Sequence, residues 1–345
     1  MNILLTATLN RSLFTNGLNQ NIIFFSEMLK DMGYNVSICV NHDVEESLNP
    51  PLGILIMGEH ELDEYKFDYI LQSGFLLKEE SVLNAKRKNS RCKNIHIHYG
   101  NRLLTDIEMS VLDDKTSLSP LRVDESWVSP HYSFSIPYLQ TYYNTQKVFV
   151  CPYIWTPKYM DESLRYVPNS PQNIGVMEPN LNITKNCLMP IFLIEKVFKE
   201  EPDLIEALQV YCSSGLRDKL YFKSLMSKLS IILKGKAFFG NRVPMHEAFS
   251  RSNVLVSHQL LNGLNYTYME ALYLDIPLIH NSEYIREAGY YYPEYDLNIG
   301  AEKLKEALKF HKENLSDYKV QAQKVIQRFS PFNENVRNQY RSLLA

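Results

Sequence analysis

Residues 234–292 alternate short apolar runs with helical segments, and this alternation most limits the folds open to the chain. The runs at 237–239, 254–257 and 278–280 are typical of buried parallel strands, while 245–251 and 266–274 have helical spacing. This order predicts a doubly wound α/β domain, in which ligands bind beyond the carboxyl ends of the strands. Polar residues or glycines follow each predicted strand and form the expected binding edge: Gly240, Arg242, His258, Asn281 and Ser282.

The N-terminal half repeats this organisation. A strand at 2–7, a helix at about 19–32 and a strand at 35–40 form a βαβ unit, and further strands are predicted at 53–57, 69–72, 94–98 and 126–128. A length of 345 residues fits two domains of ordinary size. Proline-dense segments at 152–157 and 168–171 predict the hinge. We therefore expect an N-terminal Rossmann-like domain at 1–160 and a C-terminal one at 170–320.

Several motifs resemble known glycosyltransferases. Glu270-Ala271-Leu272 followed by Asp275-Ile276-Pro277 is similar to a segment of nucleotide-sugar glycosyltransferases of the GT-B fold, which have two Rossmann-like domains facing each other across a cleft. The segments FFGNR, VSHQ, LNYTYMEALY, PLIHNS and AGYYYPEYD resemble a GT-B-like family of bacteria and tailed phages. Asn262 stands where the common pattern has a second glutamate, so the role of that acid is not carried over.

The resemblance implies a donor site in the C-terminal domain. Glu270 is expected to hold the ribose of the donor. Lys185, Arg242, His258 and the helix start at Asn265 and Tyr266 would hold the diphosphate, whose charge rises as the glycosyl bond breaks. Gly240, Asn281 and Ser282 would complete the edge. No metal ion and no cofactor beyond a UDP-sugar donor are expected, because a metal-binding D-x-D motif is missing. Two amphipathic helices at 301–311 and 315–329 and a third at 333–344 follow, and residues 321–345 are expected to pack on the N-terminal domain.

Candidate acceptor-side residues lie in the N-terminal half. The loop with Asn16, Gly17, Asn19 and Gln20 precedes or opens a helix, whose free N–H groups favour an anion. The alternative is a well-capped helix start without a ligand. His98 ends a predicted strand and is a candidate general base, because imidazole titrates near neutral pH. Asp106 and Glu108 compete for this role. A buried histidine or a solvated loop acid is the alternative for each, and a metal site at His96 and His98 lacks a third ligand.

Composition narrows the class of protein. A net charge of −3 does not indicate a dedicated nucleic-acid binder, and five scattered cysteines indicate reduced thiols in a cytoplasmic protein (the host cytoplasm if phage-encoded). No apolar run approaches membrane-spanning length. The densest basic run is either a solvated helix end or a set of DNA phosphate contacts, through Lys86, Arg87, Lys88 and Arg91.

These observations lead to three hypotheses. The first is a metal-independent glycosyltransferase that moves glucose or a pentose such as arabinose from a UDP-sugar to 5-hydroxymethylcytosine in double-stranded phage DNA. The composition, rich in lysine and asparagine, resembles that of T-even-type phage proteins, and this supports the DNA acceptor. The second is a bacterial glycosyltransferase that acts on a surface polysaccharide or lipid-linked glycan. The third is a non-catalytic protein that binds nucleotide sugars, which Asn262 favours.

Overall fold

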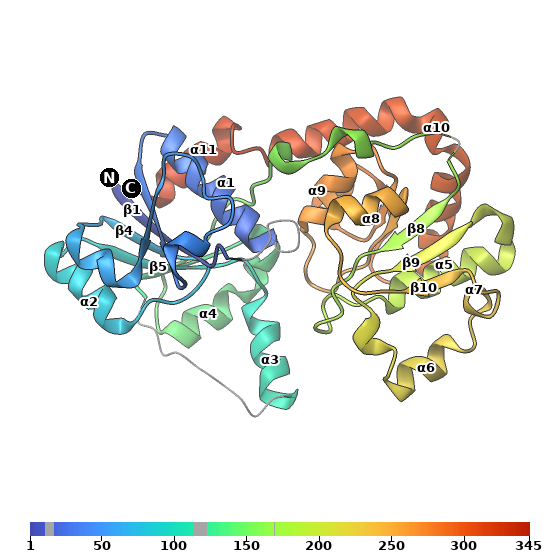
Figure 1. Cartoon of the computed structure of the whole chain (residues 1–345), viewed down its shortest axis with the longest axis horizontal. Helices are drawn as coiled ribbons and strands as arrows, with labels where there is room; N and C mark the ends of the chain where they lie inside the picture. Colours follow the sequence, from blue (N-terminus) through green and yellow to red (C-terminus); the bar gives the residue numbers. More distant parts are fainter. Residues whose placement is uncertain (11–16, 113–122, 169) are drawn as a thin grey trace. The chain divides into compact units, whose positions relative to one another are not determined.

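The computed structural model describes residues 1–10, 17–112, 123–168 and 170–345 (Figure 1). The chain divides into two compact units. Unit 1 comprises residues 1–156 and 329–345, and unit 2 comprises residues 157–328. The chain therefore passes from one unit to the other twice, and both residue 1 and residue 345 belong to unit 1.

Unit 1 is built on one parallel sheet with the strand order β3-β2-β1-β4-β5-β6-β7. Five of the six residues of β1 are buried, because helices cover both faces of the sheet and a central strand needs apolar side chains on both sides. The strands are β1 (Asn2–Ala7), β2 (Asn35–Val40), β3 (Leu55–Gly58), β4 (Tyr69–Gln72), β5 (Lys93–His98), β6 (Glu125–Val128) and β7 (Val148–Val150).

Helices α1 and α11 lie on one face of this sheet and α4 on the other (Figure 1). The α-helices of unit 1 are α1 (Gly17–Asp31), α2 (Glu79–Lys88), α3 (Arg102–Leu112), α4 (Ile136–Tyr143) and α11 (Glu334–Leu343). Helix α11 is held by apolar and polar contacts. Tyr340 packs on Phe25 of α1, with ring centroids 4.7 Å apart, and its hydroxyl donates to the Pro152 carbonyl at 2.7 Å. Arg337 pairs with Asp31 at 2.5 Å.

Unit 2 repeats the same winding with the strand order β10-β9-β8-β11-β12-β13, and each strand pairs in parallel with its neighbours in this order. The strands are β8 (Asn173–Val176), β9 (Ala207–Val210), β10 (Ala237–Phe239), β11 (Val254–Val256), β12 (Leu278–His280) and β13 (Tyr290–Tyr291). The α-helices are α5 (Leu188–Glu200), α6 (Leu220–Met226), α7 (Ser230–Leu233), α8 (Met245–Arg251), α9 (Tyr266–Tyr273) and α10 (Leu297–Arg328). The predicted fold class, two doubly wound α/β units, is confirmed.

The prediction of two helices at 301–311 and 315–329 is wrong. Residues 297–328 form the single helix α10, 32 residues long, which packs against α5 and α9. The two predicted ranges left a gap at the polar residues Lys312, Glu313 and Asn314. These residues include neither glycine nor proline, and Lys312 and Glu313 are exposed, so the helix continues through them with its polar side toward solvent.

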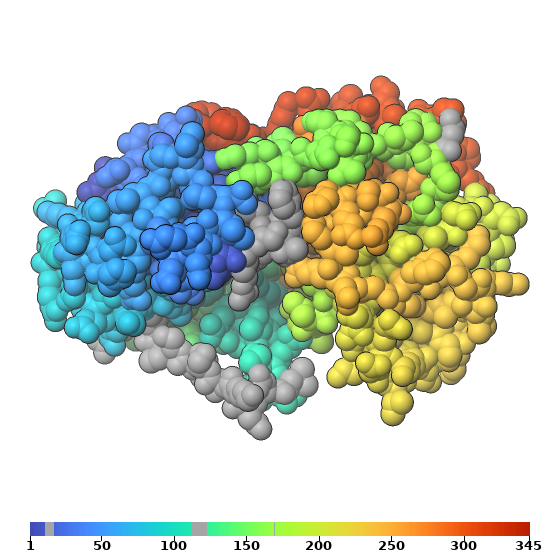
Figure 2. All heavy atoms as spheres, in the orientation of Figure 1, coloured from blue at the N-terminus to red at the C-terminus, as the bar shows by residue number. Residues whose placement is uncertain are grey.

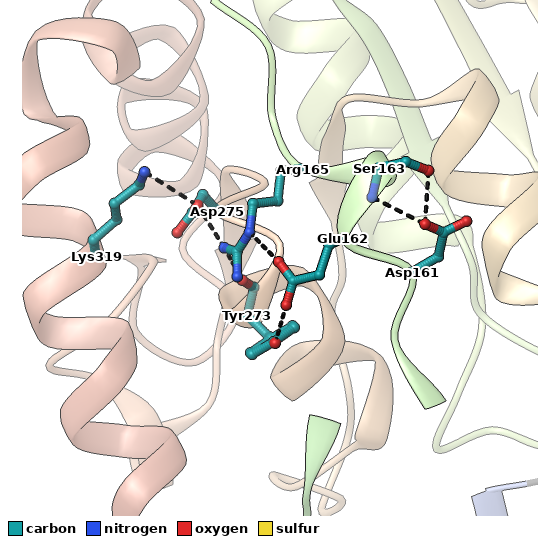
Figure 3. A network of polar contacts seen from close by, with 7 residues as sticks. All are labelled: Asp161, Glu162, Ser163, Arg165, Tyr273, Asp275 and Lys319. Atoms are coloured by element: carbon teal, nitrogen blue, oxygen red, sulfur yellow. Dashed lines mark hydrogen bonds and ion pairs between the residues drawn. The ribbon is translucent and has the colours of Figure 1, made fainter. Parts of the chain in front are cut away.

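A polar network ties the segment 157–168 to α9 and α10 inside unit 2 (Figure 3). Arg165 donates from Nη1 to the Tyr273 carbonyl at 2.7 Å and to Asp275 at 2.8 Å, and from Nε to Glu162 at 2.5 Å. Lys319 of α10 pairs with the same Asp275 at 3.3 Å. Figure 2 shows this segment, in green, at the surface beside α10, in red. The Arg165 guanidinium therefore donates to the Tyr273 carbonyl at the C-terminal end of α9. Through Asp275 it also connects the segment 157–168 with α9 and α10.

Replacing Arg165 by alanine is expected to loosen α9. The change leaves the Tyr273 carbonyl and one side of Asp275 without their donor, which costs about 2 kcal/mol for a half-exposed charged hydrogen bond. Hydrogen exchange of the α9 amides should accelerate by about 30-fold. Lys303→Ala, which removes an exposed i,i+3 pair with Glu306 on α10, is the matched control and should leave α9 exchange unchanged. Equal hydrogen exchange of the α9 amides in both variants would contradict the role of Arg165 in stabilising α9.

Candidate donor site at the edge of the second sheet

The carboxyl ends of β8 and β11 meet at the point where the strand order of unit 2 reverses, which is where doubly wound sheets bind ligands. Residues in left-handed backbone conformations gather in the loops at this edge. Asn180 follows β8, Cys212 follows β9, Leu261 follows β11 and Glu294 follows β13, with φ values of 53°, 53°, 48° and 45°. Non-glycine residues adopt this conformation at a cost, and such residues cluster at functional sites. The four left-handed residues therefore indicate a functional site at this edge.

Glu270 is the strongest single indication of a ligand site. Asn265 caps α9, accepting from the Thr267 N–H at 3.2 Å, and Glu270 follows on the buried side of the helix. Its side chain is 4 % exposed, and its Oε2 has no hydrogen-bond partner among the described residues. Burial raises the pKa of this carboxyl to about 7. A buried carboxylate oxygen without a donor is costly, and a ligand hydroxyl would satisfy it.

His258 presents a second unsatisfied atom at the same edge. Its Nδ1 lies 2.9 Å from the Tyr292 hydroxyl, which fixes the ring, while its buried Nε2 has no partner among the described residues. Burial lowers the pKa of His258 to about 4, so the ring is neutral at neutral pH. It can therefore offer one hydrogen bond to a ligand at Nε2, as donor or acceptor depending on the tautomer.

Glu178 was not among the predicted site residues, although it lies at the centre of this edge. It follows β8, is 2 % exposed, and accepts hydrogen bonds from Ser257 Oγ and from Gln259 Nε2, the latter at 3.1 Å. Burial raises its pKa to about 7, against the lowering effects of Ser257, Lys185 and Gln259. A polar residue directly after a predicted strand is the signal that identified the other edge residues, and it applies equally to Glu178.

Lys185 brings positive charge to this edge. Its backbone bridges to that of Gln259, and the Leu260 N–H donates to the Thr184 carbonyl at 2.9 Å. Burial lowers the pKa of Lys185, Glu178 raises it and Arg242 lowers it, so both charged groups act on this ammonium. Arg242 follows β10 and is exposed. The ammonium forms no side-chain hydrogen bond or ion pair within the described ranges, which leaves it available to an anion.

The remaining predicted donor residues hold the loops of this edge together. Asn281 donates to the Gln259 carbonyl and accepts from the Gln259 N–H, both at 3.0 Å. Ser282 donates to the Gly263 carbonyl, and the Gly240 carbonyl accepts from Ser213 N–H at 2.9 Å. Tyr266 is buried at the start of α9. The hydrogen bonds of Asn281, Ser282 and Gly240 described here are therefore with the protein itself, and the predicted role of these residues toward a donor stays a prediction.

The predicted acceptor-side residues all belong to unit 1. Gly17, Asn19 and Gln20 open α1, with Asn19 and Gln20 buried, while Asn16 lies outside the described residues. His98 Nε2 lies 3.5 Å from the Tyr143 hydroxyl, which is 2.8 Å from His96 Nδ1. Burial, followed by the charges of His96 and Arg102, holds the pKa of His98 well below its usual range. A neutral His98 can accept a hydrogen bond but is a weak base.

Asp106 and Glu108 lie on α3. Asp106 accepts from Arg102 Nε at 2.8 Å and from the Tyr138 hydroxyl at 2.6 Å, so its carboxylate is already engaged. Glu108 is half-buried. The structure therefore brings Arg102, Asp106 and Tyr138 together, and the assignment of a general base among His98, Asp106 and Glu108 stays a prediction.

The basic run forms the C-terminal end of α2, where cations complement the helix dipole. Lys86 pairs with Asp124 at 2.7 Å and Lys88 with Asp63 at 3.8 Å. Arg87 and Arg91 are exposed. Half of the run is therefore neutralised by acids, and Arg87 and Arg91 offer the more accessible charges.

The described residues offer neither a cluster of metal ligands nor a membrane-spanning helix. They contain no group of three or more histidine, cysteine, aspartate or glutamate side chains that could hold a metal ion. None of the helices in the described ranges is both long enough and apolar enough to span a bilayer.

Two doubly wound parallel sheets in one chain, with a polar edge at the switch point of the second, define the GT-B fold of the glycosyltransferases. The chain belongs to the family described as "Protein of unknown function (DUF2827)", which it matches over residues 3–344. No curated protein matches the chain.

Solved structures share this fold at low sequence identity. The catalytic domain of starch synthase IV from Arabidopsis thaliana, bound to ADP and acarbose, has a TM-score of 0.64 at 10 % identity, covering 100 % of this chain and 98 % of that one. The DNA-modifying enzyme β-glucosyltransferase, studied with and without uridine diphosphoglucose, has a TM-score of 0.56 at 13 % identity, covering 100 % and 99 %. The structure of S. aureus TarM in complex with UDP has a TM-score of 0.53 at 12 % identity. The match covers 83 % of this chain and 58 % of the TarM chain.

Proposed function

We propose that this protein is a glycosyltransferase that transfers a sugar from a UDP-sugar to a hydroxyl group. The observation that carries the proposal is the buried carboxylate oxygen of Glu270, which has no hydrogen-bond partner in the part of the chain that the structure describes, at the edge that also presents Lys185. A ribose hydroxyl would give the Glu270 oxygen its missing donor. The likeness of the fold to nucleotide-sugar enzymes supports the same class of ligand.

The chemistry requires positive charge where the diphosphate leaves. In the reaction the bond between the anomeric carbon and the diphosphate oxygen breaks, the acceptor oxygen bonds to that carbon, and the acceptor loses its proton. Negative charge grows on the diphosphate. Lys185, Arg242 and the N–H groups at the start of α9 are the groups proposed to stabilise it, without a metal ion. His258 would join them in the tautomer that accepts from Tyr292 at Nδ1 and donates from Nε2–H.

For the acceptor we propose 5-hydroxymethylcytosine in double-stranded DNA, with glucose or a pentose as the sugar. Two observations support a DNA acceptor: the exposed Arg87 and Arg91 at the end of α2, and a fold shared with a DNA-modifying glucosyltransferase. Unit 1 is proposed as the acceptor side. There His98 would orient the hydroxyl through a hydrogen bond, and Asp106 and Glu108 remain proposed proton acceptors.

A transfer assay tests this proposal. The full chain is incubated with hydroxymethylated duplex DNA and UDP-glucose or UDP-arabinose, and the nucleosides are analysed by mass spectrometry. A hexose or pentose mass gain on hydroxymethylcytosine, and none on unmodified duplex, is expected. Transfer only to a bacterial glycan would replace the DNA acceptor and keep the class. Binding of UDP-sugar without transfer or hydrolysis on any acceptor would instead favour the non-catalytic hypothesis.

A further inference from the structure

We propose that Glu178 is the positioning residue of the phosphate half of this site. It holds the segment 257–259 in place, and its negative charge stabilises the ammonium of Lys185. The inference rests on the proposed binding of a nucleoside diphosphate and assigns Glu178, which takes no part in the proposed transfer, to the recognition of its phosphates.

Several hydrogen-bond donors surround the carboxylate of Glu178. Ser257 Oγ and Gln259 Nε2 donate to its two oxygens, and the backbone of His258 also hydrogen-bonds to it. Three successive residues of the loop after β11 are therefore held by one side chain from the loop after β8. Because β8 and β11 are neighbours at the switch point, the carboxylate joins the two loops that border the expected ligand position.

The loop that Glu178 holds is also connected to Lys185. Gln259 forms a backbone bridge with Lys185, so the loop that Glu178 holds also fixes the start of the lysine side chain. Glu178 and Arg242 are the charged groups that act on the Lys185 ammonium. With no ion pair of its own among the residues described, this ammonium depends on the nearby carboxylate to offset the cost of burial.

The other titratable groups around Glu178 do not supply a competing charge. Tyr268, Tyr292, Cys187 and Cys212 all interact electrostatically with Glu178. Burial raises the pKa of each of them, so they are neutral at neutral pH. Among the described residues, Lys185 is therefore the cation whose charge acts on Glu178. Replacing the carboxylate by an amide should lower the pKa of the lysine further, because its remaining charged neighbour, Arg242, repels it.

Pyrophosphate is the probe that isolates the phosphate half. Titration calorimetry of Glu178→Gln is expected to show about 10-fold weaker pyrophosphate binding than the unchanged protein, with the loss of affinity at alkaline pH shifted about one unit downward. Glu178→Asp, which keeps the charge, should restore the alkaline profile at least in part. Uridine binding should be unchanged in both variants.

Glu195→Gln is the matched control. Glu195 is also a buried glutamate of unit 2, 3 % exposed, but it accepts from the Ser230 and Ile231 N–H groups at the start of α7. This variant tests for the general effect of removing a buried carboxylate and should leave the pH profile of pyrophosphate binding in place.

The outcomes separate the two proposals. Pyrophosphate that binds Glu178→Gln as tightly as the unchanged protein, with the same alkaline profile, would overturn the role of Glu178 while the proposed function stands. Should Glu178→Gln fail to fold, Glu178→Asp decides the question. Pyrophosphate affinity and an alkaline profile like those of the unchanged protein would support the requirement for charge. A full loss of pyrophosphate binding in Glu178→Asp would overturn it. An unchanged protein that binds neither UDP nor pyrophosphate would remove both proposals.

Discussion

Replacing Glu270 by glutamine is expected to weaken UDP binding by about 30-fold, because a charged acceptor for the ribose hydroxyls contributes roughly 2 kcal/mol more than a neutral one. Pyrophosphate binding should stay as it is, since Glu270 is proposed to contact the ribose. Titration calorimetry with UDP, uridine and pyrophosphate measures the three affinities separately. Unchanged UDP and uridine binding would remove the ribose assignment.

The same substitution should stabilise the fold above neutral pH. The pKa of Glu270 is raised from 4.5 to about 7 by burial, so the folded protein binds the proton more tightly than the unfolded chain does. Stability of the unchanged protein therefore falls as pH rises through this window, by up to about 3 kcal/mol from this group. Glu270→Gln should gain most of that amount at about pH 8 and lose the advantage below about pH 4.5.

Thermal unfolding across this pH range checks the result. Glu306→Gln, which alters an exposed carboxylate on α10, serves as the control and should show no gain at any pH. A gain in stability that accompanies a loss of ligand affinity would show that Glu270 is retained at the expense of the fold. Equal stability of Glu270→Gln and the unchanged protein above neutral pH would contradict the cost assigned to its burial.

Replacing Lys185 by methionine is expected to have the largest effect on phosphate binding. Methionine keeps the apolar stem but removes the ammonium, and the loss of a partly desolvated phosphate contact costs about 3 kcal/mol, or roughly 100-fold in affinity. Both UDP and pyrophosphate should bind more weakly by this factor, whereas uridine should be unaffected.

The control for this experiment is Lys196→Met on α5, which removes a lysine paired with Glu200 at the surface of the same unit. It should leave all three affinities unchanged. If Lys185→Met bound pyrophosphate as tightly as the control does, the diphosphate could not lie against this lysine.

Much of the fold followed from local patterns in the sequence. The bounds of β2, β4, β10 and β12 coincide with those predicted, because each is a short run of mainly β-branched or apolar residues, bounded at one or both ends by glycine, asparagine, proline or other polar residues. The break predicted inside α10 failed because a local run of polar residues is ambiguous. Only the apolar residues on either side of it, such as Leu308 and Tyr318 against the rest of the unit, decide that the helix continues.

The candidate site was predictable in its location but not in its partners. The rule that ligands bind after the strands led to His258, and the likeness to glycosyltransferases led to Glu270. That Glu178 binds Ser257 and Gln259 depends on residues about eighty positions away along the chain. Sequence spacing carries no signal for such a contact. Only the folded structure shows that the protein supplies hydrogen bonds to Glu178 and that the described residues supply none to Oε2 of Glu270.

The division of the chain has a consequence for its synthesis. Residues 157–328 are contiguous, so unit 2 can complete its sheet as soon as it has left the ribosome. Unit 1 is translated first but lacks α11 until the last residues emerge, and until then Phe25 and the Tyr69 hydroxyl, which bonds to the Leu344 carbonyl, stay uncovered. The unit that is translated first is thus the last to complete its fold. A stop codon shortly after position 328 would damage the half made first and spare its neighbour.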